Sequence, residues 1–158
     1  MRQRRGQAFE TMMLVISVIV ALAILGVLMN ILGGLGGGIG SDPKQAVLQK
    51  VQAQAGQPGA STAAKIKVTT DGYSIRKDDV LRDTTILTGE VQFICAEDAE
   101  TAGLCGGDTI TDTAITLKKA DYFFVVCGYP ERDGVKYGIA FGRTAASADG
   151  ACVEENLD

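Results

Sequence analysis

The chain has 158 residues with four cysteines and no histidine, so the side chain that most often shuttles protons near neutral pH is missing. Setting aside Arg2, Arg4, Arg5 and Glu10 leaves 12 of the 15 basic and 18 of the 19 acidic residues, a net charge of −6. This acidic balance argues against nucleic acid as a partner, and the length allows an apolar N-terminal segment plus one modest domain.

The segment Met12–Leu32 is apolar and contains no Asp, Glu, Lys or Arg. As a helix it would be about 31 Å long, which matches a hydrocarbon core of roughly 30 Å. Arg2, Arg4 and Arg5 precede the segment, and no basic residue follows it before Lys44. The positive-inside bias then places the N-terminus in the cytoplasm and the remainder outside. We therefore predict a transmembrane helix at residues 12–32.

A cleavable secretory signal peptide is the alternative interpretation of this segment. Its apolar region usually has only about 7–15 residues, although the glycines at 33–40 would offer small residues for cleavage. Glu10 is unexpected in both cases, because a carboxylate beside an apolar helix is costly unless it reaches the lipid headgroups or finds a partner.

The N-terminal residues also resemble a known family. Basic residues, Gly6, a polar segment with Gln7 and Glu10, and about twenty apolar residues resemble the class III signal peptide of type IV pilins, in the Gln-x-x-Glu form of archaeal pilin-like proteins. The resemblance implies that residues 1–11 are a basic leader and processing segment, which a prepilin peptidase cuts on the cytoplasmic side.

Two cuts beside Gly6 are compatible with the resemblance. A cut between Gly6 and Gln7 makes Glu10 the fourth residue of the mature chain, and a cut between Arg5 and Gly6 makes it the fifth. The resemblance implies that the apolar helix is retained and packs in a filament core. It also implies that Glu10 pairs with the new N-terminal amine of a neighbouring subunit, which would relieve the cost of a lone carboxylate among apolar helices.

A joint and a short helix are predicted in residues 33–64. Six of the eight residues from 33 to 40 are glycine, which predicts a flexible hinge. Asp42 and Pro43 are typical of a helix start. A narrow apolar face follows at Val47, Leu48, Val51 and Ala55. Gly56 and Pro58 end this helix, and a linker of small residues reaches position 64.

From Lys65 onward the pattern alternates with period two, which predicts strands. The candidates are Lys65–Thr70, Tyr73–Ile75, Thr84–Leu87, Val91–Cys95, Thr113–Leu117, Tyr122–Cys127 and Val135–Phe141. Asp71-Gly72 is a tight-turn signal, Pro130–Gly134 is typical of a hairpin loop, and Tyr122–Cys127 is apolar enough for a central strand. The predicted fold class is α+β: a transmembrane helix, a hinge with a short helix, and a small antiparallel sheet or sandwich at residues 65–158 outside the membrane.

The cysteines favour two disulfides over a zinc site. There is no Cys-x-x-Cys pair and no histidine, so zinc would need an unusual four-cysteine spacing. Four cysteines allow three connectivities. We expect Cys95–Cys105, which closes an acidic loop, and Cys127–Cys152, which ties the tail to a strand.

Residues for catalysis are scarce. The chain has no Gly-x-Ser-x-Gly motif and no glycine-rich phosphate loop between a strand and a helix. Glu97, Asp98, Glu100 and Asp108 could in principle bind calcium, but their spacing matches no calcium loop. We predict no catalytic, cofactor or metal site, and no enzyme.

The resulting hypothesis is a type IV pilin-like structural subunit that polymerises through its N-terminal helix into a cell-surface filament. Its partners would be copies of itself, the membrane and a prepilin peptidase. It would lie in the cell membrane before assembly and in the filament afterwards. The alternative is a single-pass, membrane-anchored extracellular binding module that does not polymerise.

Overall fold

The computed structural model describes residues 4–35 and 42–157, with the side chains of residues 12–28 and 42–157. It divides the chain into two compact units, residues 1–36 and 37–158, which we describe separately. The predicted hinge falls largely outside the described residues, because residues 36–41 are not among them. Its first residues, Gly33 and Gly34, are helical.

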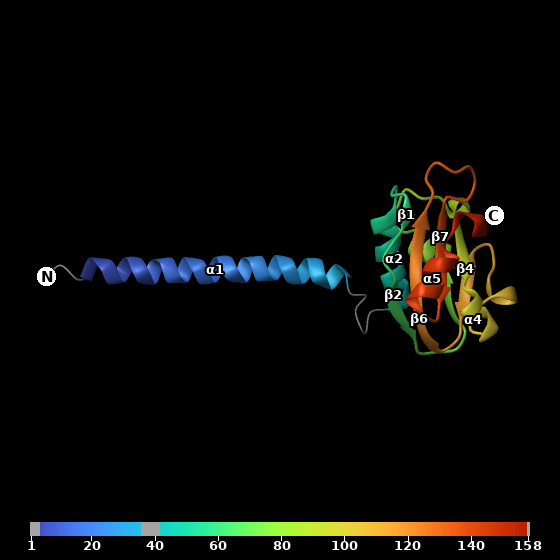
Figure 1. Ribbon diagram of the computed structural model, residues 1–158, viewed down its shortest axis with the longest axis horizontal. Coiled ribbons are helices and arrows are strands. Elements are labelled where there is room, and N and C mark those ends of the chain that lie inside the picture. Colours follow the sequence, from blue (N-terminus) through green and yellow to red (C-terminus); the bar gives the residue numbers. More distant parts are fainter. Residues whose placement is uncertain (1–3, 36–41, 158) are drawn as a thin grey trace. The chain divides into compact units, whose positions relative to one another are not determined.

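The first unit is the helix α1, Arg4–Leu35, which runs without interruption through the apolar segment (Figure 1). Among the described residues, no helix is both long enough and apolar enough to cross a membrane. The prediction of a transmembrane helix at 12–32 is therefore wrong. The apolar side chains that the structure describes cover residues 12–28, about 26 Å of helix, against a hydrocarbon core of roughly 30 Å.

The second unit is built on a five-stranded sheet. Its strands are β1 (Gly59–Ala60), β2 (Ala64–Val68), β4 (Val91–Cys95), β6 (Ala120–Gly128) and β7 (Tyr137–Gly142). The strand order is β1-β6-β7-β4, with β2 also paired to β6. β6 is antiparallel to β1, β2 and β7, as expected of a central hairpin strand, whereas β4 is parallel to β7.

The fold is thus α+β with a mixed sheet, and the prediction of a purely antiparallel sheet or sandwich is wrong. The physical reason is connectivity: β4 and β7 are separated along the chain by β5 and β6, and such a long crossover permits a parallel pair. A separate two-stranded antiparallel sheet joins β3 (Tyr73–Arg76) to β5 (Ala114–Leu117). Consequently β2 and β3, on either side of Asp71-Gly72, do not form a hairpin.

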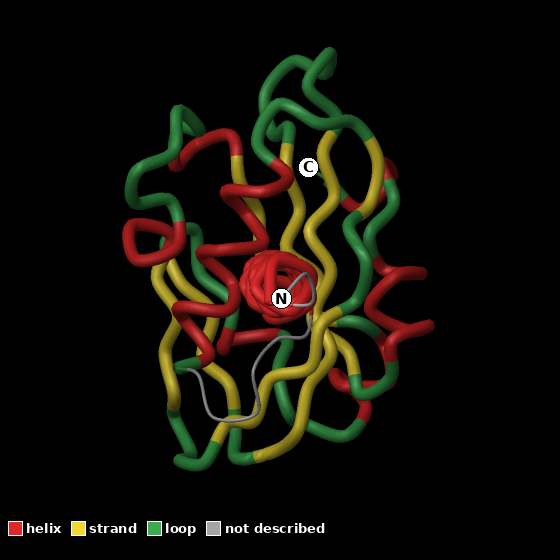
Figure 2. The backbone as a smooth tube through the Cα atoms, turned by 90° about the vertical axis from the view of Figure 1, so that its left-hand side faces the viewer, coloured by secondary structure: helices red, strands yellow, loops and turns green. Residues whose placement is uncertain are grey.

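Helices cover both faces of the larger sheet (Figure 2). The helix α2 (Pro43–Gln54) buries Val47 and Val51 in the larger core, with Phe124 and Phe141. The helix α5 (Ala145–Ala151) packs on the other face. The remaining short elements are α3 (Lys77–Val80), α4 (Glu97–Thr101) and the 3₁₀ turns η1 (Thr88–Glu90), η2 (Gly107–Thr109) and η3 (Glu154–Asn156).

One face of β7 carries only glycine and alanine, and α5 packs on this face. A Cβ atom at Gly142 would lie 2.7 Å from the backbone nitrogen of Ala148, so only glycine allows this close approach. At Gly138 a Cβ atom would lie 2.9 Å from Cys127 Sγ. The glycine and alanine residues that alternate with large apolar residues in β7 therefore leave room for α5 to pack on that face of the strand.

Most of the predicted strands and both disulfides are confirmed. The disulfides join Cys95 to Cys105 and Cys127 to Cys152, with Cα–Cα distances of 5.9 and 5.7 Å. The predicted helix start is also confirmed, since Asp42 caps α2 by accepting a 3.1 Å hydrogen bond from the Lys44 backbone. The strand expected at Thr84–Leu87 is absent from the structure, which has a bend followed by irregular backbone there.

Candidate assembly interface

The described part of α1 exposes apolar side chains on every side. Residues 12–28 are all exposed, and they span more than four helical turns. The large apolar side chains among them are 47–67% exposed: Met12, Met13, Leu14, Val15, Ile16, Val18, Ile19, Val20, Leu22, Ile24, Leu25, Val27 and Leu28. A helix that is apolar all round is normally buried, so this surface requires a covering partner.

The contrast with the second unit is sharp. Its large apolar side chains are packed inside, and among those described only Leu87, at 67%, and Val153, at 40%, are comparably exposed. Isolated exposed apolar residues of this kind are ordinary on protein surfaces. The continuous surface of α1 is not, and it sets this helix apart as the candidate interface.

The energy available from covering α1 is comparable to the cost of association. Complete burial of one Leu, Ile, Val or Met side chain is worth about 1.5–3 kcal/mol. The 13 large side chains are roughly half exposed, so covering them favours association by on the order of 10 kcal/mol or more. Association itself costs an estimated 4–15 kcal/mol, about the same size, so close packing would decide the outcome.

Two residues shape the surface locally. Ser17 is the one hydroxyl side chain in residues 12–28, and it donates a 2.9 Å hydrogen bond to the Met13 carbonyl, so no polar group of the stretch needs an external partner. At Gly26 a Cβ atom would meet no described atom within 4 Å. Nothing in the part of the chain that the structure describes therefore requires glycine there, although glycine costs a helix about 1 kcal/mol relative to alanine.

The residues predicted for processing and assembly lie in the first turns of α1. The helix begins at Arg4, so Gly6, Gln7 and Glu10 all lie on its backbone. Their side chains are outside the described part of the chain. The cut beside Gly6 and the pairing of Glu10 with an amine of another subunit stay predictions.

A polar cluster fixes the start of the second unit. The Tyr73 hydroxyl donates to the Asp42 carboxylate, which also caps α2. Lys44 Nζ lies 2.9 Å from an Asp79 carboxylate oxygen and 5.8 Å from the centre of the Tyr73 ring. This cluster, Asp42–Lys44–Tyr73–Asp79, links α2 to β3 and α3 at the first described residues of the unit.

Ionisation in this cluster is shifted by its contacts. Burial, the hydrogen bond to Asp42 and the negative charge of that residue raise the pKa of Tyr73 to about 12. The hydrogen bond from Lys44 lowers the pKa of Asp79, with a smaller contribution from its positive charge. Only the Asp42 cap is predictable from the sequence, because the other partners are more than 30 positions away in the chain and carry no local motif.

The acidic residues near the first disulfide do not assemble into a metal centre. Among the side chains that the structure describes, those of residues 12–28 and 42–157, no three His, Cys, Asp or Glu are grouped closely enough to hold a metal ion. Glu97, Asp98 and Glu100 lie on α4, and Asp108 lies on η2. Asp98 instead accepts hydrogen bonds of 3.2 and 3.3 Å from the Arg143 backbone.

Comparisons with protein-family models, with curated proteins and with solved structures find no match to this chain. The resemblance to archaeal type IV pilins therefore depends on the N-terminal residues alone. What the chain does has to be inferred from the chemistry of its own surfaces.

Proposed function

We propose that this protein is a structural subunit of a cell-surface filament, and that copies assemble through α1. The observation that carries the proposal is the uninterrupted apolar surface at residues 12–28, which is exposed on all sides of the helix. Packing α1 helices from several copies against one another would cover this surface completely, which a single flat partner could not do.

The second unit supports the same proposal in a different way. Its own apolar side chains are buried, and two disulfides tie β4 and β6 to neighbouring segments. Disulfides of this kind persist in oxidising surroundings, which fits a unit that faces the outside of a cell. The unit would then form the outer surface of the filament. The cell-membrane stage and the prepilin peptidase remain proposals that follow from the resemblance.

Mass spectrometry of the protein purified from its native cells tests the processing step. We expect a mature chain that begins at Gly6 or Gln7 and retains α1. A chain that still begins at Met1 would contradict processing, and one that begins beyond residue 33 would contradict assembly through α1.

A substitution tests the assembly function proposed for Glu10. The variant Glu10→Gln keeps the size of the side chain but removes the charge that the new amine would pair with. We expect few or no filaments in electron micrographs of cells that make Glu10→Gln at normal protein levels. Filaments as abundant as those of the wild type would remove the assembly function assigned to Glu10.

A further inference from the structure

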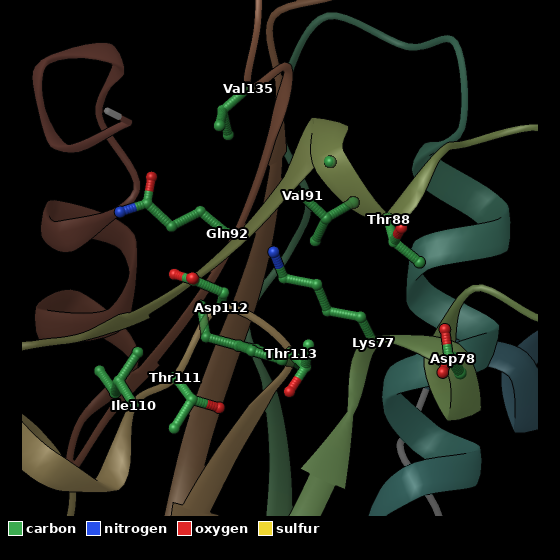
Figure 3. A pocket seen from close by; sticks show the side chains of 12 residues that line it. Lys77, Asp78, Thr88, Val91, Gln92, Ile110, Thr111, Asp112, Thr113 and Val135 are labelled. Atoms are coloured by element: carbon green, nitrogen blue, oxygen red, sulfur yellow. The ribbon is translucent and has the colours of Figure 1, made fainter.

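A cavity of about 560 Å³ lies beside β4 and contains the side chain of Lys77 (Figure 3). Lys77 is the first residue of α3, and its side chain extends across the cavity toward β4. Its backbone nitrogen donates a 2.8 Å hydrogen bond to the Thr113 carbonyl, which fixes the point from which the side chain starts. The volume is typical of sites that take small molecules, which measure roughly 300–1,000 Å³.

The amine of Lys77 has no bonded partner. Within residues 12–28 and 42–157, its Nζ forms no ion pair within 4.0 Å and no hydrogen bond. Of the other lysines, three form ion pairs of 2.7–2.9 Å, one donates hydrogen bonds to a threonine, and three are exposed. In that order they are Lys44, Lys65 and Lys136; Lys50; and Lys67, Lys118 and Lys119. Among the described side chains, Lys77 is therefore the one lysine that is partly buried without such a partner.

The surroundings of Lys77 favour the uncharged form of its amine. Burial lowers its pKa, and the negative charge of Asp112 opposes this shift with a smaller effect. Asp78 is the one other ionisable residue that lines the cavity. A lower pKa leaves a larger fraction of the amine neutral near pH 7, and only the neutral amine has the lone pair that attacks carbon.

The other residues of the cavity suit a small uncharged molecule. Ile110 and Val135 are partly exposed and supply apolar wall, while the Thr88 hydroxyl can donate a hydrogen bond to a carbonyl oxygen. The carboxylates of Asp78 and Asp112 also line the cavity, so they disfavour an anion beside Lys77.

From the cavity and its unpartnered amine we propose that Lys77 is a modification site that takes small, uncharged aldehydes. The Nζ lone pair attacks the aldehyde carbon, and a C–N bond forms. The carbonyl oxygen leaves with the two amine hydrogens as one water molecule, and an imine then joins Lys77 to the former aldehyde. The step needs no oxidant or reductant. It is independent of assembly through α1, because every residue that it uses lies in the second unit.

The test treats the full chain, in detergent micelles at pH 7, with butanal and sodium cyanoborohydride, which reduces any imine to a stable amine. Peptide mass spectrometry then follows the label on each lysine with time. We expect Lys77 to be labelled severalfold faster than Lys118 and Lys119, although those two residues are more exposed. Labelling of Lys77 at the same rate or more slowly would overturn the proposal.

Two carboxylate variants test whether the cavity controls the amine. Asp112→Asn removes the negative charge that favours the ammonium form, so labelling of Lys77 should begin at lower pH than in the wild type. Glu131→Gln removes an exposed carboxylate outside the cavity and should leave the pH profile unchanged. An unchanged profile in Asp112→Asn, or the same shift in both variants, would contradict the assignment.

A charged aldehyde tests the class of molecule that the site takes. Glyoxylate carries a carboxylate, which the groups of Asp78 and Asp112 repel. With the label on Lys118 as the reference, Lys77 should therefore take up less glyoxylate than butanal. An equal or greater relative uptake of glyoxylate would contradict selection for uncharged aldehydes.

Discussion

At the scale of single residues, Tyr73 shows how a polar contact fixes the beginning of the second unit. Its hydroxyl donates to Asp42, the residue that caps α2, and its ring lies beneath the Lys44 ammonium. The Tyr73 hydroxyl can donate this hydrogen bond only while it is protonated. The contact therefore links the stability of the unit to pH.

Because of Tyr73, we expect the second unit to lose stability in alkali. Its pKa is about 12 in the folded chain, against an ordinary value of 10.0. Because the folded pKa is the higher one, the contribution is fully present below pH 10 and is lost as the pH rises from 10 to about 12. Denaturant unfolding across this window should show a smaller decline for Tyr73→Phe than for the wild type. Parallel declines would show that Tyr73 is not the group responsible.

Gly26 predicts a close contact between helices. Because no described atom lies within 4 Å of a Cβ placed there, and leucine favours a helix more than glycine does, Gly26→Leu should not lower the thermal stability of the separate chain. In an assembly, small residues let helix backbones approach closely, so Leu should reduce filament formation severalfold in electron micrographs.

Ala21→Leu is the matched control for Gly26→Leu. Ala21 is also small and exposed, and it lies on a different side of α1 from Gly26. We expect it to reduce filaments less than Gly26→Leu. If both variants assemble like the wild type, Gly26 does not mark a contact.

At the scale of elements, the packing of α5 on β7 depends on glycine, which has no side chain, at the point of contact. Gly142→Val would place a Cβ atom 2.7 Å from the Ala148 nitrogen and should push α5 away from β7. We expect a loss of about 1–3 kcal/mol in the free energy of unfolding, measured by circular dichroism in denaturant.

Gly150→Ala is the control for that substitution. It lies on α5 as well, but on its exposed side, and a Cβ atom there meets nothing described within 4 Å. We expect stability to stay the same or to rise by up to about 1 kcal/mol, as alanine favours a helix interior. A similar loss in both variants would mean that the packing of α5 on β7 does not set the stability.

The same elements show what could be predicted from the sequence. The strands at 91–95 and 122–127 and the cap at Asp42 follow from local patterns, and the structure has them. The parallel pairing of β4 with β7 has no local signal, because the partners are more than 40 positions apart. α5 could not be predicted because its sequence, rich in alanine with one glycine, has no large apolar residue to show helical periodicity.

The candidate interface was predictable only in part. The apolar segment is evident from its composition, but its continuation through Gly33 and Gly34 is not, since glycine normally disfavours a helix interior. The cavity of about 560 Å³ beside β4 (Figure 3) was not predictable, because Lys77, Asp112 and β4 come together only through the pairing of β3 with β5 and of β4 with β7.

At the scale of the whole molecule, the chain has two units with opposite surfaces. The second unit buries its apolar side chains and presents acidic ones, whereas α1 presents apolar side chains throughout its described part. This difference between the two surfaces is expected of a subunit in which one part contacts other copies and the other part faces water.

The most direct measurement of this account is filament formation by Ile19→Lys, observed by negative-stain electron microscopy of native cells. Ile19 is 61% exposed on α1, and Leu87→Lys is the control, since Leu87 is 67% exposed outside α1. We expect Ile19→Lys to abolish filaments, because a charge cannot be buried among apolar helices without a partner, and Leu87→Lys to leave them intact. Normal filaments from Ile19→Lys would contradict assembly through α1.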